Sequence, residues 1–218
     1  MRSNLIFHSI KQLGFFLILG LFLLAVTYAQ NTPHTIVKHT ADTLISELTK
    51  EPEKLKNNPE AYRKIVRGVL VPVVNFEEIA KRVMGKTHYL AATEAQRKQF
   101  VDVFKESLVS TYSTGLEIFD NQEIKVLDPN PAEAVLPVQS IDMEVKTSDG
   151  TIFPLRFTLE KNQAGEWKIV NVILNGVNVG KAYRSHFMES ATKYADNIDQ
   201  IIANWSAKIA EEGKVVQK

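Results

Sequence analysis

The chain has 218 residues, and its 26 basic and 25 acidic side chains give a formal net charge of +1, which provides no electrostatic footprint for nucleic acid. It contains no cysteine, so disulfide bridges, thiol chemistry and cysteine-based metal sites are excluded. With 44% hydrophobic residues, it is long enough to bury a real core within one domain.

The first 29 residues have the pattern of a secretory signal. Arg2 and Lys11 flank the start of an apolar run over residues 13–26, and residues 27–29 offer a signal peptidase its cleavage position. The run is shorter than the roughly 20 residues that cross a bilayer, which favours cleavage over the alternative of an uncleaved anchor. We therefore expect a signal peptide over residues 1–29 and a single domain over 30–218. That domain would carry 24 basic and 25 acidic residues, a net charge of −1.

Two helices are expected after the signal. From Pro33 to Leu48, apolar residues recur at helical spacing, which predicts a first amphipathic helix. Asn58 is suited to cap a second helix, and Pro59 to occupy its first turn. Pro72 should bend or end that second helix.

Two more helix starts carry capping signals. Asn75 stands three residues before Glu78 and opens a short helix that Gly85 is expected to end. Thr93 and Gln96 form the next capping box and open a long helix. One face of that helix repeats apolar residues at intervals of four: Phe100, Phe104, Leu108, Tyr112 and Leu116.

From Glu123 the hydrophobic period changes from helical to two, which predicts strands over about 123–127, 135–146, 153–160 and 167–174. Turn sequences at 148–150 and 163–165 connect the last three of these strands as hairpins. Pro154 lacks a ladder donor, so its strand should be an edge strand or contain a bulge. Helices over about 179–193 and 196–212 close the chain. We expect an α+β fold with an antiparallel meander of about four strands packed against several helices.

The sequence contains no catalytic constellation that a motif would reveal. The four histidines after the signal lack the spacing of a zinc protease helix. A Gly-x-Ser-x-Gly elbow, a phosphate-binding glycine loop and a dinucleotide fingerprint are all missing. We expect no catalytic residue, no metal site and no cofactor. A small enzyme or sensor that acts on a hydrophobic ligand through one buried carboxylate or tyrosine needs no contiguous motif, so this class stays open.

An ordered set of short motifs carries a family resemblance. The motifs are Leu70 to Phe76, Met84-Gly85-Lys86, Ala92-Thr93, Gln96-Arg97, the long apolar stripe, Trp167-Lys168, Gly176-Val177 and Tyr183-Arg184-Ser185-His186-Phe187. In this order, over most of residues 36 to 205, the chain resembles the MlaC family of periplasmic phospholipid-binding proteins, also called toluene-tolerance proteins. It departs from the family at Glu94, where a proline is common, and at Asn175 and Asn178, where the family often has Glu and Ser.

The resemblance implies a periplasmic phospholipid carrier and not an enzyme. Such a carrier would shuttle lipid between an inner-membrane MCE/ABC transporter complex and an outer-membrane lipoprotein–porin complex, and so maintain outer-membrane lipid asymmetry. The acyl tails would lie in an apolar cavity enclosed by the sheet and the helices. The residues expected to contact the tails are Val83, Phe104, Leu108, Tyr112, Leu116, Phe153, Leu155, Phe157, Val177, Val179 and Tyr183.

Each of these residues has a competing interpretation, because an apolar face can equally fill an ordinary packed core. A structural envelope protein with a solid core is therefore a third class beside the carrier and the enzyme or sensor. A hollow beside these residues would favour the carrier, whereas close packing throughout would favour the structural class.

Overall fold

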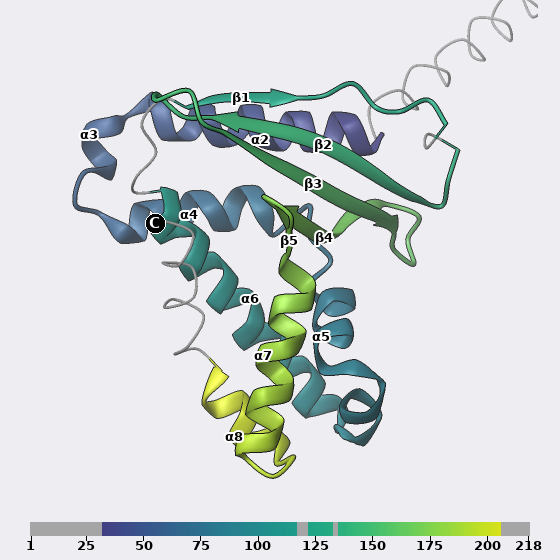
Figure 1. The fold of residues 1–218 in the computed structure, drawn as a ribbon. Helices are drawn as coiled ribbons and strands as arrows, with labels where there is room; N and C mark the ends of the chain where they lie inside the picture. The colour runs from purple at the N-terminus through teal and green to yellow at the C-terminus, as the bar shows by residue number, and fades with distance from the viewer. Residues whose placement is uncertain (1–31, 117–121, 133–134, 206–218) are drawn as a thin grey trace, which may run out of the picture.

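A computed structural model describes residues 32–116, 122–132 and 135–205 (Figure 1). The expected signal segment lies outside these ranges, as does the part of the last predicted helix beyond residue 205. None of the helices in the described ranges combines the length and the apolarity that crossing a membrane requires.

The described residues form seven helices and one five-stranded sheet, so the α+β prediction is confirmed. The helices are α2 (Pro33–Lys50), α3 (Pro52–Leu55), α4 (Pro59–Leu70), α5 (Phe76–Ala91), α6 (Glu94–Leu116), α7 (Val179–Lys193) and α8 (Ile198–Ala203). The strands are β1 (Glu123–Val126), β2 (Val138–Lys146), β3 (Ile152–Lys161), β4 (Trp167–Leu174) and β5 (Val177–Asn178), paired antiparallel in chain order.

The sheet has one strand more than the expected four. The chain reverses at Asn175 and Gly176, both with positive φ, and Val177 and Asn178 then pair with the end of β4. Two residues are too few to show a period of two, so hydrophobic alternation could not predict β5. The four-residue helix α3 was missed for the same reason, since it is barely one turn long.

Local capping explains where the helices begin. The side-chain oxygens of Asn58 and Asn75 accept hydrogen bonds from backbone N–H groups three residues later, as predicted. Thr93 and Gln96 exchange bonds between side chain and backbone, which confirms that capping box. These contacts satisfy backbone donors that a helix start leaves without partners.

The helix that begins at Phe76 is interrupted at Gly85, as predicted, but a second helical segment follows within α5. Gly85 has φ 69° and ψ 167°, which breaks the helix, but helical structure resumes and continues to Ala91. The guanidinium of Arg184 on α7 donates a hydrogen bond of 2.9 Å to the carbonyl oxygen of Arg82, a group that the break frees. A partner from another helix therefore stabilises a kink where the sequence alone indicated a stop.

Pro154 lies on a central strand, not on an edge strand, because β3 runs between β2 and β4. The register between β3 and β4 shifts between Thr158 and Leu159, where the residue without a partner is Val170 of β4, away from the proline. The pairing of β3 with β4 begins only at Leu155, and the Pro154 carbonyl accepts a bond from Asn175 N in the turn after β4. The backbone nitrogen of Pro154, which has no hydrogen to donate, therefore faces a position beyond the end of β4. No hydrogen bond between β3 and β4 is lost.

The molecule has two buried clusters. The sheet lies across the top of Figure 1 with α2 against it, and α5, α7 and α8 extend away from the sheet with α6 beside them. The smaller cluster lies between α2 and the sheet and consists of Val37, Ile141, Leu159 and Ile169. The larger cluster, called the helical core below, includes Phe76, Val83, Phe100, Phe104, Tyr183, Phe187, Ile201 and Trp205.

Candidate functional site

The apolar stripe of α6 runs out of the helical core. Phe104 is fully buried, and its ring centroid lies 5.2 Å from that of Tyr183 and 6.1 Å from that of Trp205. One turn later Leu108 is 8% exposed, and after a further turn Tyr112 is 36% exposed. The stripe therefore begins in close packing and ends beside accessible space.

Tyr112 is surrounded by protein but not covered by it. Burial raises the pKa of the Tyr112 hydroxyl to about 12, because the phenolate would be poorly solvated there. The same residue keeps 36% of its surface accessible. Tyr112 therefore lies where neighbouring protein lowers its solvation while part of its side chain stays accessible.

The inner face of the sheet is filled at one end and open at the other. Leu159 is fully buried in the smaller cluster with Ile141 of the paired strand. Phe157, Leu155 and Phe153 follow on the same face of β3, and all three are only half-buried. Phe157 packs at the border of the cluster, whereas Leu155 and Phe153 belong to neither buried cluster.

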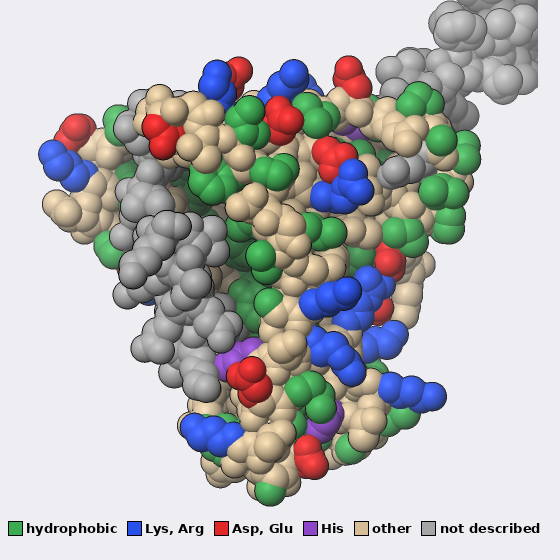
Figure 2. All heavy atoms as spheres, viewed as in Figure 1, with side chains coloured by type: hydrophobic (Ala, Val, Ile, Leu, Met, Phe, Trp, Pro, Cys, Tyr) green, Lys and Arg blue, Asp and Glu red, His purple; other side chains and the backbone are tan. Residues whose placement is uncertain are grey.

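The end of the α6 stripe and the open end of the sheet lie on the same side of the molecule. Leu116 ends α6 only seven positions before Glu123, which pairs with Lys146 beside the β2–β3 turn. Figure 1 shows this end of α6 below the same end of the sheet. In Figure 2, hydrophobic side chains are visible between the sheet and the helices on this side of the molecule. We define the inner-face group as Tyr112, Leu116, Phe153 and Leu155.

Helices α2 and α4 supply further half-buried residues that sequence reasoning missed. Leu44 lies on the face of α2 that carries Val37 and Leu48, but it is half-buried where they are buried. On α4, Tyr62 and Val69 flank the buried Val66 and are also half-buried. Helical spacing places such residues on the inward face, but only tertiary structure shows that their side is left partly open.

The expected tail contacts therefore fall into four places, of which the inner-face group is one. Val83, Phe104, Leu108 and Tyr183 lie within the helical core, with Val179 packed at its border. Phe157 borders the smaller cluster. Val177 is 57% exposed on β5, in register with Leu155 across Leu174 of β4. Lipid contact by each of these residues remains a prediction, and an enclosed cavity between the sheet and the helices remains one as well.

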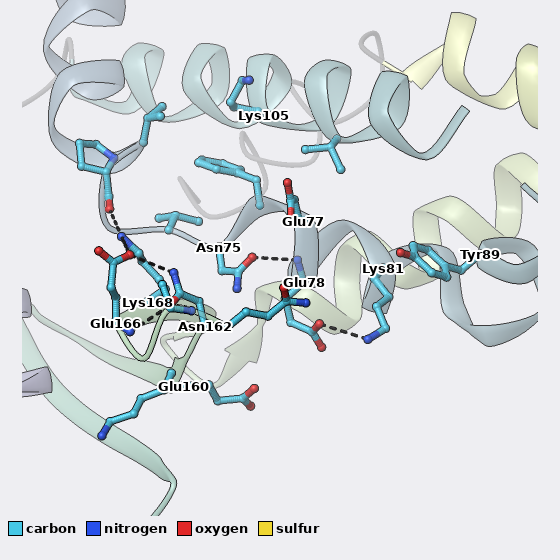
Figure 3. Close-up of a pocket in the computed structure, with 18 residues that line it drawn as sticks. Asn75, Glu77, Glu78, Lys81, Tyr89, Lys105, Glu160, Asn162, Glu166 and Lys168 are labelled. Atoms are coloured by element: carbon cyan, nitrogen blue, oxygen red, sulfur yellow. Dashed lines mark hydrogen bonds and ion pairs between the residues drawn. The ribbon is translucent and has the colours of Figure 1, made fainter. Parts of the chain in front are cut away.

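A pocket of about 820 Å³ opens elsewhere, between the β3–β4 turn, the α4–α5 connection, α5 and α6 (Figure 3). Its walls combine apolar side chains with charged and amide side chains. Lys168 donates to the Pro72 carbonyl, Asn162 to Glu166, and Lys81 to Glu78. These bonds close turns and helix starts, so the pocket differs in chemistry from the apolar cavity that the sequence predicts.

The described residues offer little acid–base or metal chemistry. They contain no group of three or more side chains that could hold a metal ion. His88 Nε2 lies 2.9 Å from Asp196 Oδ1, and the His88 ring packs edge-on against Phe187. This pair joins α5 to the turn after α7, which is a packing role.

Comparison with known proteins gives consistent results. A family model described as "MlaC protein" matches residues 38–207. The chain is 35% identical over 203 residues to a protein named toluene tolerance protein ttg2D from Pseudomonas putida, with 93% of each chain covered. It is 29% identical over 156 residues to a Haemophilus influenzae protein named as the MlaC binding protein of an intermembrane phospholipid transport system, with 69% and 71% covered.

The fold also has a solved counterpart. A phospholipid-binding protein from Ralstonia solanacearum, solved in complex with a phospholipid, superimposes with a TM-score of 0.70 at 21% sequence identity. The match covers 84% of this chain and 97% of that one. At this level of identity the likeness supports the shared architecture.

Proposed function

Because the chain belongs to the MlaC protein family, we propose that it binds phospholipid and carries it across the periplasm. MlaC family proteins are periplasmic, and two of the three proteins above are named for phospholipid binding or transport. In this proposal residues 1–29 are a signal peptide that exports the chain, and residues 30–218 form one lipid-binding domain.

The observation that carries the proposal is the change along α6. Its apolar stripe passes from the fully buried Phe104 to the accessible Tyr112, whose pKa burial nevertheless raises to about 12. The half-buried Phe153 and Leu155 on the sheet extend the same accessible apolar surface. We infer that the two acyl tails lie against the inner-face group, where they would complete the burial of its side chains.

The energetics show why such a carrier is needed. Each methylene of an acyl chain costs about 0.8 kcal/mol in water, so a lipid with some 30 methylenes costs on the order of 24 kcal/mol to expose. That cost prevents free phospholipid from crossing an aqueous compartment at a useful rate. A protein that keeps the tails covered during the crossing removes most of the barrier.

The head group is expected to remain near solvent. Among the described residues, the buried polar side chains are His88, Ser107, Ser113 and His186, with no buried lysine or arginine. A phosphate clamped in the interior would need such a cation. We therefore expect the protein to accept different head groups and to select by the length and volume of the tails.

In the wider proposal, lipid passes between an inner-membrane MCE/ABC transporter complex and an outer-membrane lipoprotein–porin complex, and this exchange maintains outer-membrane lipid asymmetry. The family membership supports this role. The carrier's own structure sets no direction, since transport follows the free energies of its partners.

The test is to purify the exported chain from bacterial cells without detergent and to record native mass spectra, followed by organic extraction of the lipid. The proposal predicts phospholipid bound at about one molecule per chain, or uptake to that level from vesicles. Tyr112→Asp should lower the occupancy, because it places a charge against the tails. A chain that is bare and takes up no phospholipid from vesicles would refute the proposal and favour a structural role, whereas a different co-purified hydrophobic molecule would favour an enzyme or sensor.

A further inference from the structure

Basic side chains gather on one face of the molecule. Figure 2 shows Lys and Arg side chains clustered over the region where Figure 1 places α5 and α7. Lys86 on α5 and Lys181 and Arg184 on α7 are exposed. The described residues place no carboxylate within ion-pair distance of any of the three.

Neighbouring cations on the same helix are already neutralised. Arg82 pairs with Glu78 at 2.9 Å and with Glu160 at 2.6 Å, and Lys81 pairs with Glu78 at 3.3 Å. These ion pairs lie at the edge of the surface that carries Lys86, Lys181 and Arg184. Beyond them, toward the end of α5, the positive charge is left for a partner to neutralise.

Exposed apolar residues accompany the three free cations. Leu90 is 63% exposed one turn after Lys86, and Met188 is 40% exposed one turn after Arg184. The two helices lie in register here, because the rings of His88 and Phe187 are 5.3 Å apart. Val177 extends the surface at the start of α7. We call this set the α5/α7 patch: Lys86, Leu90, Val177, Lys181, Arg184 and Met188.

Arg184 is held in place before any partner binds. Its Nη1 donates to the Arg82 carbonyl across the α5 kink, and its guanidinium lies against Gly85, where a Cβ atom would overlap it. The residue as a whole remains exposed. A preorganised arginine loses little conformational entropy on binding a carboxylate, which favours a specific contact.

We propose that the α5/α7 patch docks an acidic, partly apolar protein surface on the membrane complexes with which the carrier exchanges lipid. The inference rests on the proposed function, because it names the partner surface for that exchange. Fixed cations with exposed apolar residues between them match the composition of protein interfaces, where arginine and methionine are enriched. Long-range attraction would speed the encounter and would weaken with salt.

Two other binding partners fit the α5/α7 patch less well, namely a second copy of this chain and an anionic membrane. A symmetric pair of copies of this chain would place the same three cations against each other, which costs free energy. An anionic membrane surface attracts mobile lysines as well as a fixed arginine, so it gives no reason for anchoring Arg184 to the kink. The membrane surface is retained as an outcome of the test.

The experiment measures binding of the lipid-loaded chain to the purified inner-membrane MCE/ABC complex of the same bacterium, held in nanodiscs of neutral phosphatidylcholine. Lys86→Glu/Lys181→Glu should weaken binding by roughly tenfold or more at low salt, and the wild-type affinity should fall as NaCl rises. Lys64→Glu/Lys125→Glu is the matched control. It changes two exposed lysines on α4 and β1 that make no ion pair among the described residues, with the same change of charge.

Arg184 is left unchanged in every variant, because its loss would also affect the α5 kink. Lys86→Gln/Lys181→Gln leaves Arg184 in place and should give a weaker, intermediate loss, with unchanged thermal unfolding. Native mass spectra of every variant report bound phospholipid, so failure of the carrier function is seen independently of docking. Equal binding by wild type and Lys86→Glu/Lys181→Glu would overturn the inference. So would a loss confined to phosphatidylglycerol vesicles, which would assign the patch to a membrane.

Discussion

The helical core and the sheet end of the molecule use the same kinds of residue for different purposes. In the helical core, the rings of Phe100, Phe104, Phe187 and Trp205 have centroids 5.0–6.1 Å apart, and all four residues are fully buried. At the sheet end, the inner-face group of Tyr112, Leu116, Phe153 and Leu155 is half-buried or exposed. Helix α6 runs through both regions. An apolar stripe is therefore not evidence of a single role, and exposure along the stripe decides which end is packed.

The largest expected contrast comes from truncating α6 at its two ends. Phe104→Ala should lower the free energy of unfolding by about 3–5 kcal/mol, because it leaves a cavity among aromatic rings that cannot collapse. Tyr112→Ala should cost less than about 1 kcal/mol, because the side chain is already partly accessible. Urea unfolding of the delipidated proteins measures both changes. Equal losses would show that the stripe is packed along its whole length.

A second contrast uses two leucines on one face of β3. Leu159→Trp should destabilise the protein by about 1–3 kcal/mol, because Leu159 is fully buried and the larger ring has no room. Leu155→Trp should leave stability nearly unchanged but reduce the bound phospholipid, because the indole would occupy the open side. Thermal unfolding and native mass spectrometry report the two effects. A Leu155→Trp protein that carries a full lipid load would remove Leu155 from the tail site.

The α5 kink allows a smaller contrast between two glycines. Gly85→Ala should cost about 1–3 kcal/mol, because φ is 69° and the added Cβ would overlap the Arg184 guanidinium. Gly68→Ala should instead stabilise the protein by about 0.5–1 kcal/mol, since Gly68 lies inside α4 with open space around its Cβ position. Chemical denaturation of both variants checks the signs. A neutral Gly85→Ala would indicate that the kink relaxes easily.

The smallest expected effect is a pH dependence at Tyr112. Its folded-state pKa is raised from the ordinary 10.0 to about 12 by burial, so folding favours the neutral phenol. The corresponding stability is present below pH 10 and is lost as the pH rises toward 12. Ultraviolet titration, read as the difference between wild type and Tyr112→Phe, should show this late ionisation. Bound phospholipid should delay it further, and an identical curve with and without lipid would place Tyr112 outside the tail site.

Local chemistry determined how much of the fold could be predicted from sequence. Asn58, Asn75 and Thr93 mark helix starts correctly, because a cap involves residues only three positions apart. The strands were predicted because their residues alternate between a covered and an uncovered face. The break at Gly85 was predicted, but the helical segment after it was not, since Arg184, which stabilises the kink, lies on another helix nearly a hundred residues later.

The candidate site was less accessible to sequence reasoning. Period and residue type place Phe104 and Tyr112 on one stripe, but they carry no information on whether a neighbour fills the space beside each residue. Tyr183 was also predicted to contact the tails, and the structure shows its ring packed against Phe104 in the helical core. Val177 was placed with the inward residues, although the short β5 strand leaves it exposed. These distinctions depend on tertiary contacts that no local pattern encodes.

A short parallel bridge limits how the helices could move when lipid enters or leaves. Val74 pairs with Ile169 of β4, Asn75 N donates to the Ile169 carbonyl at 2.9 Å, and Ile169 N donates to the Val73 carbonyl at 2.8 Å. These bonds attach the connection between α4 and α5 to the sheet. If α4 moves away from the sheet, we expect it to rotate about residues 73–75. The amides of Asn75 and Ile169 should then stay protected from hydrogen exchange, while the amides of α4 exchange faster. We therefore expect residues 73–75 to stay fixed to β4 while α4 moves relative to the sheet.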